Sequence, residues 1–198
     1  MREVLTDASA LCRVGTPLNA AFGPCAVAVA GSRESRAKLA REIGRRLAEA
    51  GTVTGFSCGV DEEASFGALE AGGRVAAVLP CGRLNPRAAL LLCVAAARRA
   101  PASAAAENLA KDERRVGAWP AARNRIVVNI ASALAAPEAK FKPTRWGTRH
   151  AAERALKTGR LVVALKPRPG DAGVLEAFNY FTRLGAVAAE GRRSPQHD

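Results

Sequence analysis

The sequence predicts an α/β fold, a doubly wound Rossmann-like domain in which a mostly parallel sheet carries helices on both faces. Three observations predict it. Short apolar runs of strand length alternate along the chain with segments whose apolar residues recur at every third or fourth position. The alternation is regular, as in parallel sheets built from strand–helix–strand units. Glycine-bearing turns lead from several of the apolar runs into the next helical segment.

The 198 residues suit one domain, which we expect over residues 25–190. Residues 1–24 carry weaker signals, among them a short helix over Val4–Arg13, and are expected to form a lead-in that packs on this domain. Residues 191–198 are expected to be a disordered tail.

The first half of the domain is expected to alternate strictly between strands and helices. Each strand is a short apolar run, and the first two helices end at glycines, Gly51 and Gly72-Gly73, which are common at helix C-termini. In chain order the elements are strand Cys25–Ala30, helix Ser35–Ala50, strand Thr52–Phe56, helix Glu62–Ala71, strand Val75–Pro80, helix Ala88–Arg99 and a weak strand Ser103–Glu107.

The second half continues the same alternation. Ile126, Val127 and Ile130 recur at helical spacing in the segment that follows Trp119-Pro120. Gly159 is expected to end a later helix. After the first of these helices, the expected elements are strand Ala133–Ala136, a basic loop Lys140–Trp146, a helix from Gly147 to about Thr158, strand Leu161–Leu165, helix Ala172–Leu184 and strand Ala186–Ala189.

The chain is strongly basic, with a net charge of +12 and an isoelectric point of about 10.5. Basic surfaces attract polyanions such as nucleic acids. Arginine greatly outnumbers lysine, which favours contacts with phosphates and stacking on bases. The alternative is a generally basic composition that serves solubility.

Several classes of protein are disfavoured by what the sequence lacks. The five cysteines are scattered without a C-x-x-C pair and only two histidines are present, so we expect no metal site. We find no signal peptide and no apolar run long enough to span a bilayer, so we expect a cytoplasmic protein without membrane contact. The Walker A and G-x-G-x-x-G patterns are absent, and we expect no cofactor. His150 and His197 give little basis for catalysis, and no catalytic residue is assigned.

The turn Gly31-Ser32-Arg33 is the first candidate for anion binding. It follows the strand Cys25–Ala30 and opens a helix, so free backbone N–H groups and a positive helix end are expected there. Arg33 adds a charge and a bidentate donor. An ordinary turn with a solvated arginine is the alternative. In a parallel sheet, this turn lies on the same edge as the turns at Gly59, Gly82 and Gly147.

The triplet Arg123-Asn124-Arg125 is the second candidate. It stands at the start of an otherwise apolar helix, where positive charges oppose the helix dipole, so its arginines suggest a bound anion. Surface arginines around a solvated asparagine are the alternative. We call the residues expected to bind phosphate on this sheet edge the predicted rim: Gly31, Ser32, Arg33, Gly59, Arg123, Asn124, Arg125, Gly147 and Thr148.

Five blocks of sequence stand in order along the chain: Gly31-Ser32-Arg33, Gly59-Val60-Asp61 through Gly67-Ala68-Leu69, Gly72-Gly73 through Cys81-Gly82, Arg123-Asn124-Arg125-Ile126, and Gly147-Thr148 through Gly159-Arg160. Taken together, these blocks resemble the Rossmann-like domain of the DNA-processing protein A (DprA/Smf) family. Three departures from the family pattern are Ser65 in place of a usual histidine, Trp119-Pro120 one residue further from the arginine triplet, and an alanine-rich strand before Gly147.

This resemblance implies single-stranded DNA binding without base specificity and without catalysis, by a homodimer that passes the strand to a recombinase. It implies phosphate contacts from Ser32, Arg33, Arg123 and Arg125, with Asn124 shaping the loop. DNA, RNA and a free nucleotide all remain open as ligands, because a site that contacts phosphates reads neither the base nor the sugar.

An enzyme is the alternative from a different class. Nucleotide phosphoribohydrolases of the lysine-decarboxylase-like type resemble this kind of fold and use a P-G-G-x-G-T loop with a nearby glutamate. Here the corresponding residues are Arg145-Trp146-Gly147-Thr148, and Glu153 stands further along than that motif needs. We therefore expect nucleotide hydrolysis to be the weaker alternative.

Overall fold

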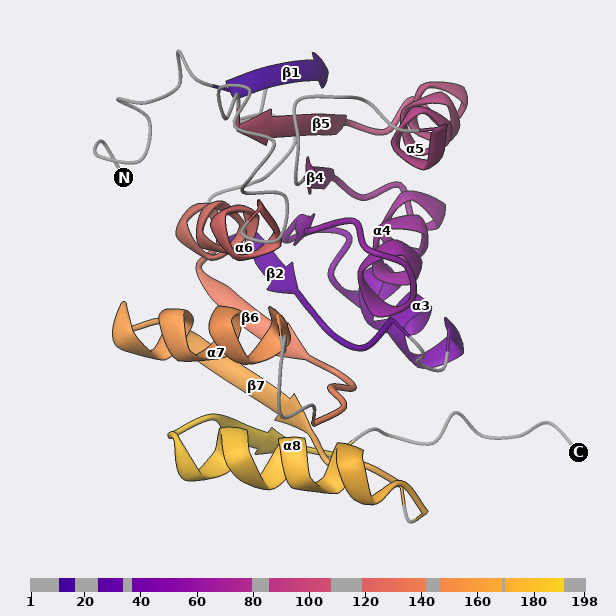
Figure 1. The fold of residues 1–198 in the computed structure, drawn as a ribbon. Helices are drawn as coiled ribbons and strands as arrows, with labels where there is room; N and C mark the ends of the chain where they lie inside the picture. The colour runs from indigo at the N-terminus through magenta and orange to yellow at the C-terminus, as the bar shows by residue number, and fades with distance from the viewer. Residues whose placement is uncertain are drawn as a thin grey trace, which may run out of the picture.

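The computed structural model describes residues 11–16, 25–33, 37–79, 86–107, 119–141, 147–168 and 170–190. In these residues the strands form one sheet in the order β1-β5-β4-β3-β2-β6-β7-β8 (Figure 1). All neighbouring strands are parallel except β1 and β5. The strands are β1 (Leu11–Gly15), β2 (Val27–Val29), β3 (Thr52–Thr54), β4 (Val75–Leu79), β5 (Ala102–Glu107), β6 (Ala133–Ala136), β7 (Leu161–Leu165) and β8 (Val187–Ala189).

Helices cover both faces of the sheet, which confirms the predicted doubly wound α/β fold. The chain moves from β2 to β5 in one direction and from β6 to β8 in the other, so right-handed crossovers place the two sets of helices on opposite faces. Figure 1 shows α3, α4 and α5 on one side and α6 and α7 on the other. The helices are α3 (Ala37–Arg46), α4 (Val60–Glu70), α5 (Pro86–Ala97), α6 (Trp119–Ile130), α7 (Gly147–Lys157) and α8 (Ala172–Arg183).

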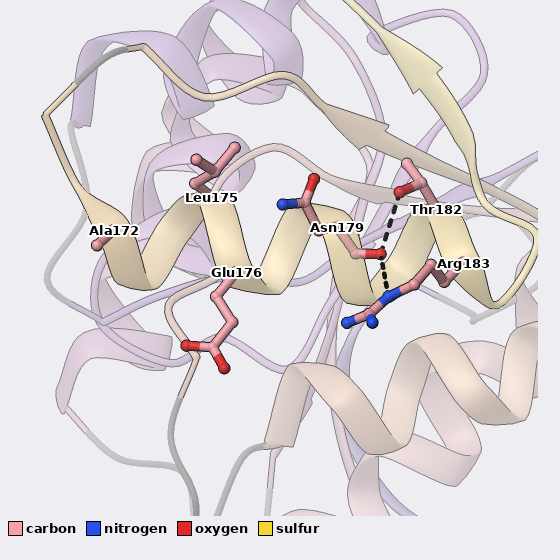
Figure 2. Close-up of a pocket in the computed structure, with 6 residues that line it drawn as sticks. All are labelled: Ala172, Leu175, Glu176, Asn179, Thr182 and Arg183. Carbon is pink, nitrogen blue, oxygen red and sulfur yellow. Dashed lines mark hydrogen bonds between the residues drawn. The ribbon is translucent and has the colours of Figure 1, made fainter.

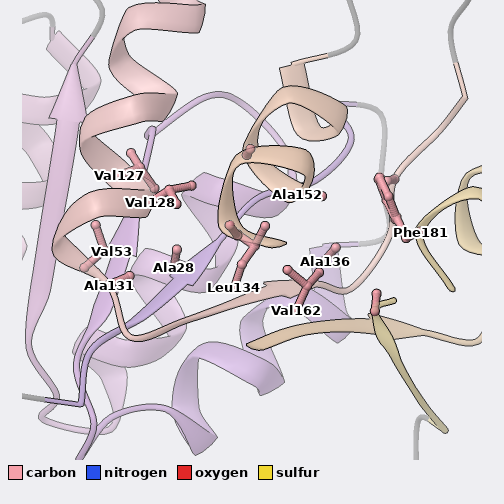
Figure 3. Close-up of a cluster of buried hydrophobic side chains, with 14 of the residues drawn as sticks. Ala28, Val53, Val127, Val128, Ala131, Leu134, Ala136, Ala152, Val162 and Phe181 are labelled. Atoms are coloured by element: carbon pink, nitrogen blue, oxygen red, sulfur yellow. The ribbon is translucent and has the colours of Figure 1, made fainter. Parts of the chain in front are cut away.

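Successive side chains of β4 enter different cores, as the twofold period of a strand requires. Val75 and Ala77 pack with Leu69 on the α4 side of the sheet. Ala76 and Val78 belong to a core that α6, α7 and α8 cover. Figure 3 shows that this second core is built largely from alanine and valine, with Ala28, Val53, Val128, Ala152 and Val162 among its members. Leu134 and Phe181 are its larger side chains, and Phe181 is its one aromatic group among the fully buried described residues.

Helices α3 and α4 touch backbone to backbone through two glycines. A Cβ atom on Gly44 would lie 2.0 Å from the carbonyl oxygen of Ala64, and one on Gly67 would lie 2.0 Å from that of Arg41. The Arg41 guanidinium also binds Glu63 at 2.9 Å and Glu70 at 2.5 Å. The hydrogen bonds and charges of the arginines lower the pKa of Glu70 to about 2. This close contact fixes α3 and α4 relative to each other.

The N-terminal part of the chain differs from its prediction. Leu11–Arg13 form the beginning of β1 and not the end of a helix, while residues 4–10 of the expected helix lie outside the described residues. Strand β1 pairs antiparallel with β5, from Leu11 opposite Glu107 to Gly15 opposite Ser103. Backbone hydrogen bonding to an open sheet edge outweighs a weak local helix preference.

Most other elements lie where they are expected, with ends that shift by a few residues. Helix α3 ends at Arg46 and not at Ala50, and α4 begins at Val60, two residues early. Gly82, the start of the expected helix at Ser35, most of the basic loop over Lys140–Trp146 and the expected tail over 191–198 lie outside the described residues. Within the described ranges, none of the helices has both the length and the apolar character needed to span a membrane.

Candidate nucleic-acid interface

The candidate site lies where the direction of chain winding reverses. Strand β2 is flanked by β3 on one side and β6 on the other. In open α/β sheets, ligands bind at this reversal, outside the carboxyl ends of the strands. The segments that follow these three strands, together with α6, carry the predicted rim. Because α6 begins at Trp119, the triplet Arg123-Asn124-Arg125 lies in its second turn and not at the helix start as expected.

Contacts in the structure join four separate segments of the predicted rim. The Val60 N–H, directly after Gly59, donates to the Ser32 carbonyl oxygen at 3.1 Å. The Thr148 hydroxyl donates to the carbonyl oxygen of Gly31 at 3.3 Å. The side-chain amide of Asn124 donates to the Gly147 carbonyl oxygen at 2.9 Å. The expectation that these turns share one sheet edge therefore holds for Gly31, Gly59 and Gly147.

The amides of the first turn are not free as expected. The Gly31 N–H donates to Oδ1 of Asp61 at 3.3 Å, and the Ser32 N–H donates to the carbonyl oxygen of Glu138 at 2.8 Å. The backbone comes so close to its neighbours here that a Cβ on Gly31 would lie 2.6 Å from both Glu138 O and Val60 Cγ2. The turn therefore uses these two donors internally, and the exposed side chain of Arg33 is what it presents to solvent.

Arg123 is buried, with an exposed fraction of 8%. Its Nη1 donates to the carbonyl oxygen of Gly55 at 2.6 Å and to the hydroxyl of Ser57 at 3.1 Å. Its Nε and Nη2 donate to Oδ1 of Asn124 at 3.2 and 3.1 Å. The guanidinium thus joins α6 to the loop after β3, and direct contact between Arg123 and a phosphate stays a prediction.

Two features of the arginine triplet follow from its helix. Arg125 is exposed, since it stands two residues from Arg123 and on a different side of α6. A Cβ on Gly55 would lie 2.4 Å from the Arg123 guanidinium carbon, so a larger residue there would displace the buried guanidinium. The structure therefore separates the triplet into a buried arginine, a buried asparagine and a surface arginine.

No role was predicted for Asp61, although it belongs to the block of sequence that begins at Gly59. It is 5% exposed, and its Oδ2 accepts a hydrogen bond from the Ser57 N–H at 3.4 Å, while Oδ1 accepts the bond from Gly31. Burial raises the pKa of Asp61 to about 6, although the charges of Arg123 and Arg33 act in the opposite direction. An aspartate two residues after a glycine, in the first turn of a helix, is the sequence signal that marked this residue.

Asp61 is expected to make stability depend on pH. Its folded-state pKa of about 6 lies above the usual 3.8, so its contribution is fully present below pH 3.8 and is lost as the pH rises through 6. The shift corresponds to about 3 kcal/mol at most. Urea unfolding at a series of pH values should show the free energy of unfolding of the unmodified protein falling relative to Asp61→Asn across this range. Parallel profiles for the two proteins would contradict the assignment.

Ser65, which replaces the family's usual histidine, is fully buried behind Asp61. Its hydroxyl donates to the main-chain oxygen of Asp61 at 2.8 Å and lies 3.0 Å from the hydroxyl of Thr54. Thr54 Oγ1 in turn accepts the N–H of Phe56 at 3.1 Å. Phe56 has a φ of +50°, a strained conformation for a residue other than glycine. These contacts hold the loop after β3 in its shape.

Glu153, considered above as the glutamate of a nucleotide hydrolase, is engaged elsewhere. Its carboxylate accepts hydrogen bonds from Arg149 Nε at 2.7 Å and from the Tyr180 hydroxyl at 2.5 Å. Partial burial raises its pKa, but these two hydrogen bonds and the arginine charge outweigh burial and lower the pKa overall. The group is therefore held as an ionised partner of α8 and is poorly suited to donate a proton.

A hollow of about 530 Å³ lies along α8, away from the predicted rim (Figure 2). Thr182 and Arg183 both donate to the carbonyl oxygen of Asn179, so their polar groups turn onto their own helix. The hollow carries one charge of each sign and no converging donors in the part described. The lining residues are Ala172, Leu175, Glu176, Asn179, Thr182 and Arg183. Across the described residues, we also find no group of three or more potential metal ligands.

A model of the DNA recombination-mediator protein A family matches residues 16–190. Among solved structures, DNA processing protein A from Streptococcus pneumoniae is 25% identical with a TM-score of 0.72, and the match covers 90% of this chain but only 62% of that protein. DNA processing protein A from Helicobacter pylori, described by its single-stranded DNA binding mode, is 22% identical with a TM-score of 0.68, covering 90% and 80% of the two chains.

A third similar structure extends the likeness in fold alone. The molybdenum cofactor carrier protein of Chlamydomonas reinhardtii is 24% identical with a TM-score of 0.53, and the match covers 85% of this chain and 89% of that protein. Comparison with curated protein sequences gives no significant match.

Proposed function

The chain belongs to the DNA recombination-mediator protein A family, and from this premise we propose that it binds single-stranded DNA along the predicted rim without catalysing a reaction. The family match, over residues 16–190, covers the whole of the domain expected over residues 25–190. The likeness to the Streptococcus pneumoniae protein supports the proposal, and the Helicobacter pylori protein, of the same fold, has a described single-stranded DNA binding mode.

The balance of charge at the winding reversal is the observation that carries this proposal. Arg33 and Arg123 stand there against the single carboxylate of Asp61, so the described groups keep a net positive charge even when Asp61 is ionised. Arg33 is exposed and can reach a phosphate directly. Arg123 is buried beneath this surface, where it contributes its charge and fixes the loop that carries Ser57. Such a surface attracts the backbone of a strand and reads none of its bases.

The same contacts favour binding over chemistry. Glu153 is held by Arg149 and Tyr180, and His150 is an exposed residue in the first turn of α7. Neither forms part of a nucleophile–base pair in the described residues. We also propose, on the resemblance to the family, that the domain over residues 25–190 acts as a homodimer and passes its strand to a recombinase.

Replacing Arg33 with alanine tests the proposal. We expect affinity for an oligothymidylate of about 25 nucleotides to fall about five- to tenfold at low salt, because one phosphate contact and its released counterion are lost. The slope of log affinity against log salt should decrease in magnitude by about 0.7–1. Fluorescence anisotropy between about 50 and 200 mM salt measures both quantities.

Arg74→Ala is the matched control. Arg74 is also exposed, but it precedes β4 and therefore lies at the opposite edge of the sheet. Its loss changes the net charge equally and should change affinity far less than the loss of Arg33. Equal effects of the two substitutions would show that binding follows the overall charge, and the predicted rim would then be wrong. Release of a free base from adenosine monophosphate would contradict the absence of catalysis.

A further inference from the structure

We propose that Asp61 is a built-in counter-anion of the nucleic-acid site, whose ionised carboxylate offsets one of the two arginine charges and limits how tightly the site holds a phosphate backbone. This inference rests on the proposed function and deepens it. It assigns Asp61 as a positioning residue that acts through its neighbours and does not itself touch the DNA.

The location of the carboxylate is the first support. In a doubly wound fold, backbone amides at the ends of the central strands point toward the phosphate of a ligand. Here the amides of Gly31, after β2, and Ser57, after β3, each point at one oxygen of Asp61. The protein therefore places its own anion where an external one would otherwise bind.

The hydrogen bonds themselves do not explain why a charged group is kept at this position. Both N···O distances, 3.3 and 3.4 Å, exceed the usual 2.9–3.0 Å, so each bond is weak. A buried carboxylate with two weak bonds costs stability unless a charge nearby compensates it. Arg123 and Arg33 supply that charge, and Asp61 in turn reduces the positive field that they create.

Among the described residues, two arginines are the charged groups that act on Asp61. Arg33 faces it from the turn after β2 and Arg123 faces it from α6. Glu62, its neighbour on α4, is paired with Arg87 at 3.3 Å. Protonation of Asp61 therefore changes the local charge from about +1 to about +2. Since the pKa of Asp61 is about 6, this change falls within the range of an ordinary binding experiment.

The experiment compares the full chain with its Asp61→Asn variant, both in a His150→Gln, His197→Gln background that removes the histidine titrations. Binding of an oligothymidylate is measured from pH 5 to pH 8 at constant ionic strength. The parent should bind about three- to tenfold more tightly at pH 5 than at pH 8, because one opposing charge is lost near the phosphates. Asp61→Asn should bind at pH 8 about as tightly as the parent at pH 5, with a flat profile.

Glu49→Gln is the matched control, since Glu49 is an exposed acid just beyond the end of α3, at the opposite edge of the sheet. It changes the net charge equally and should leave the pH profile of the parent intact. A second measurement uses the parent alone: the amide resonances of Gly31 and Ser57 should shift with pH together, at the midpoint of the binding change. That result does not depend on whether a variant folds.

The outcomes separate the two proposals. A parent that binds oligothymidylate with the same pH profile as Asp61→Asn, or amide resonances of Gly31 and Ser57 that do not shift near this pH, overturns the role of Asp61 alone. Weaker binding by a folded Asp61→Asn at pH 8 overturns it too. A parent that binds no oligothymidylate at any pH overturns the proposed function and this inference with it.

Discussion

Replacing Arg123 with methionine is expected to lower the free energy of unfolding by about 3–5 kcal/mol at pH 7.5, because it leaves the buried carboxylate of Asp61 without its main compensating charge. The substitution also removes the hydrogen bonds to the carbonyl oxygen of Gly55 and the hydroxyl of Ser57. Methionine can fill much of the same volume, so the loss reports on charge and hydrogen bonding more than on packing. Urea unfolding measures it.

Arg125→Met is the control within the same triplet. Arg125 is exposed, and its replacement should change the free energy of unfolding by no more than about 0.5 kcal/mol while weakening oligothymidylate binding. The cost of Arg123→Met should also shrink below pH 6, since protonated Asp61 needs no compensating charge. A cost that is equal for both arginines, or that is independent of pH, would contradict the buried role of Arg123.

Replacing Gly59 with alanine should lower the free energy of unfolding about as much as Arg123→Met does. Gly59 has a φ of +84°, which costs an alanine about 1–2 kcal/mol. Its new Cβ would also lie 2.4 Å from the carbonyl oxygen of Ser32 and 2.8 Å from the backbone of Arg33, so two turns of the site would have to separate. We expect a total loss of about 3–5 kcal/mol, together with loss of oligothymidylate binding.

Gly72→Ala separates the two causes. Gly72 has a similar φ of +74°, but a Cβ there would meet no atom within 4 Å. Its replacement should therefore cost about 1–2 kcal/mol and leave binding unchanged. Thermal or urea unfolding of both variants measures the difference, which is the cost of pushing the turns apart. Equal losses for Gly59→Ala and Gly72→Ala would show that the contact with Ser32 is unimportant.

The alternation of strands and helices was enough to predict the fold, and the parallel sheet was enough to predict which edge carries Gly31, Gly59 and Gly147. Neither pattern revealed the direction in which each side chain points. One signal was present: Arg123 stands four residues before Val127 and seven before Ile130, so it shares their inward-facing side of α6. Arg125 does not.

Other features could not be predicted because they depend on contacts between distant segments. The Gly31 amide meets Asp61 thirty residues away, and only the packed structure shows that this donor is already used. Strand β1 forms because β5 offers an open edge, which no local pattern in Leu11–Gly15 encodes. The glycines at 44 and 67 stand inside helices and gave no hint that two backbones meet there.

The alanine-rich interior sets how this protein should respond to random mutation. Ala28, Ala64, Ala76, Ala152 and Ala155 are all fully enclosed, and each has only a methyl group to lose. A substitution that removes atoms can therefore open a large void at few positions. A substitution that adds even one or two carbons forces neighbouring side chains apart at many positions, and each such change lowers the free energy of unfolding by about 1–3 kcal/mol. The harmful substitutions in the core should therefore be those that enlarge a side chain, the reverse of the pattern in proteins filled with leucine and phenylalanine.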